Sequence, residues 1–334
     1  MSDTQIDNLE MGYMFEELIR RFSEQSNETA GEHFTPREVI ELMVEVLLDP
    51  DMDEISTTDG KVITILDPAC GTGGMLSVAQ NKMQALNATT RVIPFGQELN
   101  PETYATCCSD MILKGNTNSR IVLGNSFNED GFQGQTFDYM LSNPPFGVDW
   151  KKVEKFIKDE AKNKGYSGRF GAGLPRISDG SFLFLQHLIS KMNAPENGGS
   201  RIGIVFNGSP MFSGDAGSGE SEIRRWIIEN DLLEAIIGLP DQLFYNTGIT
   251  TYIWILTNRK ENRRKGKVRL INGAGFYEKM RKGLGNKRNM VSSENRAEIV
   301  RLYSTYEPDE NYMDLDNDDF GYRKIVVASP LLNE

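Results

Sequence analysis

Strand-like and helix-like blocks alternate along most of the chain. Short β-rich runs are separated by segments in which apolar residues recur every three to four positions. The predicted strands are residues 61–66, 91–98, 120–124, 137–142, 201–206, 232–240, 250–256 and 267–272. The predicted helices are residues 9–22, 36–48, 75–86, 101–113, 181–189 and 222–229. Because strands joined by crossover helices run parallel, this order predicts an α/β fold with a doubly wound sheet and helices on both faces.

Local signals refine three parts of this pattern. Thr35 is a good N-cap for the helix that follows it, and Pro36 suits a first helical position. Residues 49–60 are acidic and lack a period, so we expect an exposed loop there. Residues 150–175 are polar and contain four glycines, which predicts a mobile insertion.

Length and composition exclude several classes of protein. The 334 residues are 39% hydrophobic and 25% charged, which is typical of a globular chain with a full core. No apolar run reaches the roughly 18 residues of a membrane span. The polar, acidic start of the chain is not typical of a signal peptide. Three cysteines make no plausible disulfide framework, so we expect reduced thiols in a cytoplasmic protein without membrane contact.

The charge is unevenly distributed along the chain. A net charge of −12 argues against a protein that holds a phosphate backbone by itself. Residues 259–288, however, contain twelve basic and two acidic side chains, so their net charge is +10 and the rest of the chain carries −22. Residues 151–164 are also rich in lysine. Each basic stretch is either solvated surface or a contact with an anionic polymer.

A glycine-rich loop follows the first predicted strand. It runs from Asp67 to Gly74 with the sequence DPACGTGG, and its glycines let the chain turn sharply and let a ligand approach the backbone. No Lys-Ser or Lys-Thr pair follows, which argues against the phosphate loop of NTPases. The third glycine of the dinucleotide-binding pattern G-x-G-x-x-G is also absent.

Polar residues follow the next two strands as well. Glu98 ends the second strand, 24 residues beyond Gly74, where an acid can bind both hydroxyls of a ribose. Asn125, Ser126 and Phe127 follow the third strand, where a polar side chain and an aromatic ring could contact adenine. Each residue alone is compatible with an ordinary loop. Together, at successive strand ends, they favour an adenosine-containing ligand.

The fourth predicted strand ends in Asn143-Pro144-Pro145-Phe146. Two prolines remove two backbone donors and stiffen the turn. The amide oxygen of Asn143 and the carbonyl of Pro144 remain as acceptors beside an aromatic ring. This arrangement suits an exocyclic amino group on a flat ring, and the alternative is a rigid structural turn.

These motifs carry a family resemblance. DPACGTGG followed by NPPF resembles the S-adenosylmethionine-dependent amino-methyltransferases that act on adenine in DNA. The segment GEHFTPREVIELMVEVLL, residues 31–48, resembles more narrowly the modification (M) subunit of type I restriction-modification systems, as do residues 178–189, 201–214, 234–256 and 279–288. The resemblance extends from Asp7 to Lys324. It implies a seven-stranded, mostly parallel, Rossmann-like methyltransferase sheet and transfer of a methyl group to adenine N6.

The resemblance also implies roles for individual residues. The S-adenosylmethionine contacts would come from Glu32, His33, Phe34, Thr35, Pro36 and Arg37, and from Asp67, Ala69, Gly71, Thr72, Gly73 and Gly74 around its methionine part. Glu98 would bind the ribose, and Asn125, Ser126 and Phe127 the cofactor adenine. Asn143, Pro144, Pro145 and Phe146 would be catalytic and would hold an adenine flipped out of double-stranded DNA.

Domains and partners follow from the same resemblance. Residues 1–50 would be a helical lead-in, 51–275 the methyltransferase core and 276–334 a C-terminal extension. The expected partners are a specificity (S) subunit, a second M subunit and a restriction (R) subunit. Family members usually carry longer helical regions at both ends, so we expect a fragment or a trimmed relative. The basic stretch 259–288 is expected to lie beside the NPPF turn, along a DNA-facing edge.

Other functions are compatible with parts of the sequence. NPP-aromatic turns also serve methyltransferases that act on RNA or on protein glutamine, and the chain could be a cofactor-binding scaffold that is inactive without partners. Cytosine C5 methylation needs a thiolate nucleophile, usually in a Pro-Cys pair, and Cys70, Cys107 and Cys108 do not fit that pattern. His33 and His187 are too few and too isolated for a metal site, so no metal is expected.

Overall fold

A computed structural model describes residues 35–116, 118–245 and 247–322 of the chain. The predicted helix 9–22 and the candidate residues Glu32, His33 and Phe34 lie outside these ranges. None of the helices in the described ranges is long and apolar enough to cross a membrane.

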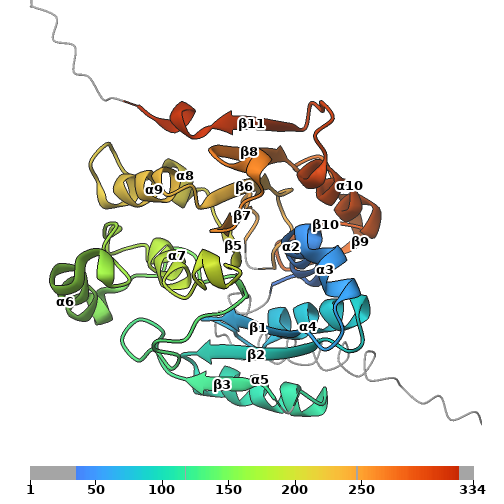
Figure 1. The fold of residues 1–334 in the computed structure, drawn as a ribbon, viewed down its shortest axis with the longest axis horizontal. Coiled ribbons are helices and arrows are strands. Elements are labelled where there is room, and N and C mark those ends of the chain that lie inside the picture. Colours follow the sequence, from blue (N-terminus) through green and yellow to red (C-terminus); the bar gives the residue numbers. More distant parts are fainter. Residues whose placement is uncertain (1–34, 117, 246, 323–334) are drawn as a thin grey trace, which may run out of the picture.

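A nine-stranded sheet forms the centre of the described structure, in the order β11-β8-β6-β7-β5-β4-β1-β2-β3 (Figure 1). Its strands are β1 (Val62–Asp67), β2 (Arg91–Glu98), β3 (Arg120–Leu123), β4 (Tyr139–Ser142), β5 (Arg201–Phe206), β6 (Leu233–Gly238), β7 (Tyr252–Thr257), β8 (Lys267–Asn272) and β11 (Tyr312–Asp316). Only β7 and the edge strand β11 pair in antiparallel fashion. The predicted doubly wound, mostly parallel sheet is therefore confirmed, and β8 and β11 extend its seven-stranded part.

Helices cover both faces of the sheet. They are α2 (Arg37–Leu48), α3 (Met52–Thr57), α4 (Gly74–Leu86), α5 (Pro101–Leu113), α6 (Glu154–Lys164), α7 (Ser181–Ile189), α8 (Ser209–Phe212), α9 (Gly219–Glu229) and α10 (Ser293–Ser304). Figure 1 shows α2, α4 and α10 on one face and α7 and α9 on the other, and each group packs an apolar cluster against the sheet. A small two-stranded sheet, β9 (Glu278–Leu284) with β10 (Lys287–Met290), stands apart from the central one.

Two segments predicted to be irregular are in fact folded. Residues 49–60 were expected to be an exposed loop, but they form a 3₁₀ turn and helix α3. Ile55 of α3 is fully buried, and the Asp51 carboxylate forms an ion pair with Arg259, 2.8 Å away. Residues 150–175 were expected to be a mobile insertion, but they contain helix α6, whose Ile157 and Glu160 are buried. Tertiary contacts stabilise both segments, and such contacts leave no periodic pattern in the local sequence.

The start of α2 also differs from the prediction. Pro36, rather than Thr35, is the N-cap residue, because Pro36 has an extended backbone and the helix begins at Arg37. The Thr35 hydroxyl makes no capping bond. It instead accepts a hydrogen bond from the side chain of Asn143, 2.9 Å away. The residue that the sequence assigned to helix capping therefore contacts the NPPF turn.

Candidate active site

The carboxyl ends of the parallel strands surround a cavity of about 770 Å³, a size that suits a nucleotide-sized ligand. Many of the predicted site residues line it: Thr35, Arg37, Asp67, Ala69, Gly71, Thr72, Gly74, Glu98, Asn125, Ser126, Phe127, Asn143 and Pro145. Pro36, Gly73, Pro144 and Phe146 are described but are not among the lining residues. The loops that follow the strand ends therefore meet around a single cavity.

The glycine-rich loop has a fixed backbone. Gly73 has a φ of +84° and immediately precedes α4. A Cβ atom at this position would lie 2.5 Å from Met111 Cε and 2.8 Å from Cys107 Sγ, so only glycine fits without movement. Both cysteines of this region, Cys70 and Cys107, are buried and pack beside the loop.

Asp67 holds this loop against the end of β4. Its Oδ1 accepts hydrogen bonds from the backbone N–H of Ala69 and from the hydroxyl of Ser142, each at 3.0 Å. Burial raises the pKa of the Asp67 carboxyl to about 7, because the charged form loses its hydration. The side chain therefore organises two site loops, and it is largely uncharged only below neutral pH.

Glu98 connects the same loop to the end of β2. Its Oε2 accepts from the backbone N–H of Gly71 at 2.9 Å, and its Oε1 accepts from Asn100 N–H at 2.8 Å. The side chain is buried but lines the cavity. Each carboxylate oxygen can accept two hydrogen bonds, so each has one acceptor position left for a ligand hydroxyl.

The loop after β3 uses its polar side chains mainly to hold its own shape. Asn125 Oδ1 accepts from the Phe127 N–H at 2.9 Å, and the Ser126 hydroxyl donates to the carbonyl of Pro68. Phe127 packs against Phe184 of α7, with ring centroids 4.6 Å apart. Ser126 therefore joins this loop to the glycine-rich loop, while the Phe127 ring contributes to the cavity wall.

Asn143 has one satisfied and one unsatisfied side-chain atom. Its Nδ2 donates to Thr35 Oγ1, but its Oδ1 is buried and has no hydrogen-bond partner in the described structure. Of the buried side-chain atoms in that condition, it is the one that belongs to a cavity-lining residue. A buried acceptor without a partner costs about 1–3 kcal/mol, so this oxygen is a candidate partner for a ligand donor. Phe146 instead packs edge-on against Phe244, with centroids 6.2 Å apart.

Comparison with known proteins identifies the family of this chain. The family model for N-6 DNA methylases matches residues 6–321. The chain belongs to the N-6 DNA methylase family. The methylase subunit of type I restriction enzyme MjaIX from Methanocaldococcus jannaschii is 28% identical over 321 residues, which cover 96% of this chain and 53% of that protein. The HindI methylase subunit from Haemophilus influenzae is 30% identical over 263 residues, or 78% of this chain and 53% of that protein.

A solved structure is also similar to this N-6 DNA methylase chain. The methyltransferase subunit of a type I restriction-modification system from Streptococcus thermophilus superposes with a TM-score of 0.76 at 27% identity, covering 95% of this chain and 62% of that one. The resemblance to type I modification subunits is thereby confirmed. The chain spans about half the length of the curated relatives it matches.

Several cavity residues of this N-6 DNA methylase had no predicted role. Trp150, Lys152 and Val153 come from the segment that was expected to be mobile, and Asp149 directly precedes it. Gly180, Phe184 and Tyr245 come from two further segments. Trp150 is buried, and its ring N–H donates to the carbonyl of Arg176 at 2.9 Å. The available signal was membership of the 178–189 and 234–256 motifs, which carried the resemblance without a residue-level role.

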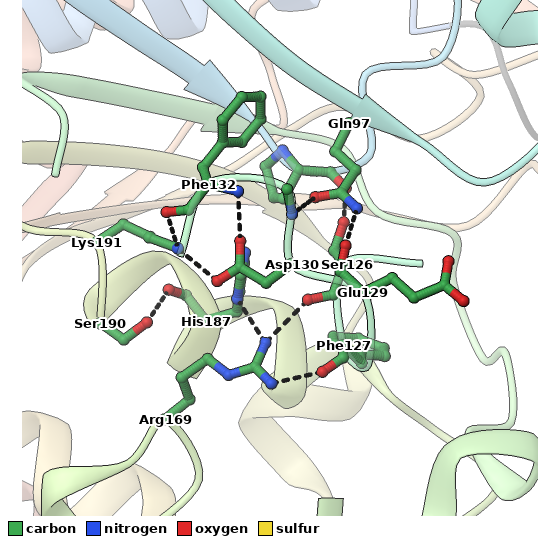
Figure 2. Close-up of polar contacts among 12 residues, drawn as sticks. Gln97, Ser126, Phe127, Glu129, Asp130, Phe132, Arg169, His187, Ser190 and Lys191 are labelled. Atoms are coloured by element: carbon green, nitrogen blue, oxygen red, sulfur yellow. Dashed lines mark hydrogen bonds and ion pairs between the residues drawn. The ribbon is translucent and has the colours of Figure 1, made fainter. Parts of the chain in front are cut away.

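Arg169, from the same segment, holds the loop after β3 by hydrogen bonds to its backbone. Figure 2 shows its guanidinium directed at the backbone of that loop and at the ring of His187. It donates to the carbonyls of Ser126, at 2.9 Å, and of Phe127, and it lies 3.1 Å from His187 Nδ1. Burial and the Arg169 charge lower the pKa of His187 to about 3, so this imidazole is neutral and its Nδ1 accepts.

Glu160 of α6 completes this contact. Its carboxylate accepts from Arg169 Nη2 at 2.7 Å and from the Arg169 backbone N–H at 2.9 Å. Burial opposes ionisation of Glu160, but the hydrogen bonds from Arg169 outweigh it and lower the Glu160 pKa. The guanidinium is thus held on one side by a carboxylate while its remaining N–H groups hold the loop that carries Asn125 and Phe127.

Proposed function

We propose that this chain transfers a methyl group from S-adenosylmethionine to the N6 amino group of adenine in DNA, as the modification subunit of a type I restriction-modification system. The observation that carries the proposal is the buried, unpaired Oδ1 of Asn143, a residue that lines the same cavity as Glu98 and the glycine-rich loop. One cavity therefore offers an acceptor for an amino group together with groups suited to an adenosine ligand.

The donor set fits the proposed cofactor. Glu98 keeps one free acceptor position on each carboxylate oxygen, which suits two neighbouring ribose hydroxyls. Phe127 supplies an apolar surface beside them, and Asp67 to Gly74 supply a close-approaching backbone. When bound, S-adenosylmethionine supplies an electrophilic methyl group on its sulfonium.

Asn143 would act on the methyl acceptor. The lone pair of an adenine amino group is delocalised into the ring, which makes the nitrogen a poor nucleophile. A hydrogen bond from that amino group to Asn143 Oδ1 favours a more pyramidal nitrogen and orients it toward the methyl group. The Pro144 carbonyl is the proposed second acceptor. No covalent intermediate with the protein is needed.

Phe146 would stack on the target base. Extruding a base from the duplex costs a few kcal/mol, and stacking on an aromatic ring returns about 1–3 kcal/mol. Phe146 is half-buried against Phe244 and would turn toward the cavity when the base enters. Pro145 already lines the cavity and stiffens the turn from which Phe146 projects.

The remaining parts of the proposal concern the assembly. Recognition of a DNA sequence is proposed to come from a specificity subunit, as the resemblance to type I modification subunits implies. A second M subunit and a restriction subunit would complete the complex. Its proposed location is the cytoplasm, where both DNA and the cofactor are found.

A methyl-transfer assay tests the proposal. The chain, with and without its specificity subunit, would be incubated with methyl-labelled S-adenosylmethionine and DNA, RNA or protein. We expect label in N6-methyladenine of duplex DNA and none in the same duplex previously methylated at adenine N6. Label in RNA or in protein glutamine would overturn the proposal. Cofactor binding without any transfer, even with the partner subunit, would identify a scaffold instead.

A further inference from the structure

The basic stretch 259–288 divides between opposite edges of the sheet. Because β7 is antiparallel to β5, its last residue Thr257 pairs with Arg201 at the start of β5. The residues that follow β7 therefore lie at the amino-terminal edge of the parallel strands, away from the cavity. Strand β8 then runs back in parallel with β6, and the chain after Asn272 emerges at the carboxyl edge. The expectation that the whole stretch lies beside the NPPF turn is wrong for its first half.

At the far edge, acidic residues neutralise most of the basic side chains. Lys260 pairs with Asp231 at 2.5 Å, and Lys267 pairs with Asp316 at 2.5 Å. Arg269 is buried and donates to Asp314 at 2.7 Å. Arg259 pairs with Asp51, as described above. These charges serve the fold and leave little positive potential for a partner.

The β9–β10 hairpin, residues 278–290, is different. Lys279, Arg281 and Lys282 are exposed, and none of them has an ion-pair partner within residues 35–116, 118–245 and 247–322. Glu278 is the one acidic residue of the hairpin. The only lysine here that is buried, Lys287, pairs with Glu38 of α2. The hairpin thus presents uncompensated positive charge to solvent.

Contacts at the turn of the hairpin place that end of it beside the cavity. The backbone N–H of Asn286 donates to the carbonyl of Tyr245, and that of Arg288 donates to Gln242, each at 2.9 Å. Tyr245 and Glu38 both line the cavity. On another part of the cavity wall, Lys152 is exposed and also lines the cavity.

We propose that Lys279, Arg281 and Lys282 bind the phosphate backbone of duplex DNA and hold the duplex across the mouth of the cavity. This inference rests on the proposed function, since it names the surface that brings that substrate to the site. The net charge of −12 does not oppose it, because charges more than about 8 Å away are largely screened at physiological ionic strength. A local cluster of cations is sufficient for backbone contacts, which do not depend on base sequence.

The test compares two triple variants of equal charge. K279Q/R281Q/K282Q removes the hairpin cations, and R263Q/K265Q/K267Q removes three exposed cations of the same basic stretch at the far edge. Fluorescence anisotropy would measure binding of each protein to a labelled random-sequence duplex of about 30 base pairs between 50 and 200 mM salt. Cofactor affinity, measured by calorimetry, checks that the cavity is intact. Lys279→Gln alone serves as a milder variant.

Three phosphate contacts contribute about 2.7 to the slope of log affinity against log salt. Between 50 and 200 mM salt, this slope corresponds to a factor of about 40 in affinity. We therefore expect the affinity of wild type to fall about 40-fold more over this range than the affinity of the hairpin variant. Lys279→Gln should lower the slope by about 0.9, and the far-edge variant should match wild type. Two results would overturn the proposed DNA-binding surface while leaving the methyl-transfer proposal intact. The first is an equal salt slope for the hairpin variant and wild type, and the second is an equal loss of duplex affinity in both triple variants. A wild-type chain that neither binds nor methylates duplex DNA would overturn both.

Discussion

The hydrogen bond between Thr35 and Asn143 makes a sharp prediction about catalysis. Thr35 Oγ1 is 2.9 Å from Asn143 Nδ2, and this contact fixes the orientation of the Asn143 amide. Thr35→Val keeps the shape and the methyl group of the side chain but removes the acceptor. The amide would then lose its preference for presenting Oδ1 to the adenine amino group, and Nδ2 would compete for that position.

The size of the effect follows from the hydrogen bond that is lost. A buried donor left without a partner costs about 1–3 kcal/mol. If the whole cost falls on the transition state, it corresponds to a decrease in kcat of about 5- to 150-fold. Cofactor affinity should change less than about threefold, because valine preserves the packing of residue 35. The predicted signature is thus a loss in kcat without a matching loss in S-adenosylmethionine binding.

Steady-state methyl transfer and calorimetry of cofactor binding measure the two quantities separately. Thr35→Ser is the matched control, since it keeps the hydroxyl and removes only the methyl group. We expect its kcat to stay within about threefold of wild type. The reasoning would be refuted by wild-type turnover in Thr35→Val, or by a serine variant that loses as much activity as the valine variant.

Three further predictions concern the cavity and its supports. Asn143→Ala should bind S-adenosylmethionine normally in calorimetry but lower methyl transfer by at least about 100-fold, and normal turnover would exclude its proposed role. Arg169→Met should raise the cofactor Kd about tenfold and lower the unfolding free energy by about 3–5 kcal/mol, whereas Arg225→Met, which removes an exposed ion pair on α9, should change neither. Asp67 has a folded-state pKa of about 7, above its unfolded value, so the wild type should lose stability as pH rises from about 4 to 7. Asp67→Asn should remove this slope in thermal melts and raise the Tm above pH 7; parallel wild-type and variant curves would contradict the assigned pKa.

The sheet and most of the cavity could be predicted because both follow from the alternation of strands and helices along the chain. Alternating strand and helix signals require parallel strands, and parallel strands bring Asp67, Glu98, Asn125 and Asn143 to one edge. This inference needs the order of the elements but not their packing. The detailed use of each side chain was not accessible in the same way. Asn125 Oδ1, expected to meet adenine, already accepts from the Phe127 N–H.

Segment 150–175 shows what local pattern cannot reveal. Helix α6 has a strongly polar sequence and buries only Ile157 and Glu160, so its sequence has little apolar period to detect. It is held by the contact of Glu160 with Arg169, which lies beyond the helix.

The prediction for the basic stretch failed for a similar reason. Residues 259–288 are continuous in sequence, but the antiparallel β7 and the parallel β8 place their two halves at opposite edges.

The loops around the cavity are joined to one another before any ligand arrives. Glu98 accepts from Gly71, Ser126 donates to Pro68, and Ser142 donates to Asp67, so the loops after β1, β2, β3 and β4 share hydrogen bonds. Displacing one loop therefore costs bonds in at least one other loop. Such coupling lowers the ordering cost of binding, because the loops that line the cavity are already held to one another. It also means that a change at Arg169, which among these four loops contacts the one after β3, should reach Asn143 through Ser126, Pro68 and Ser142 rather than through the ligand.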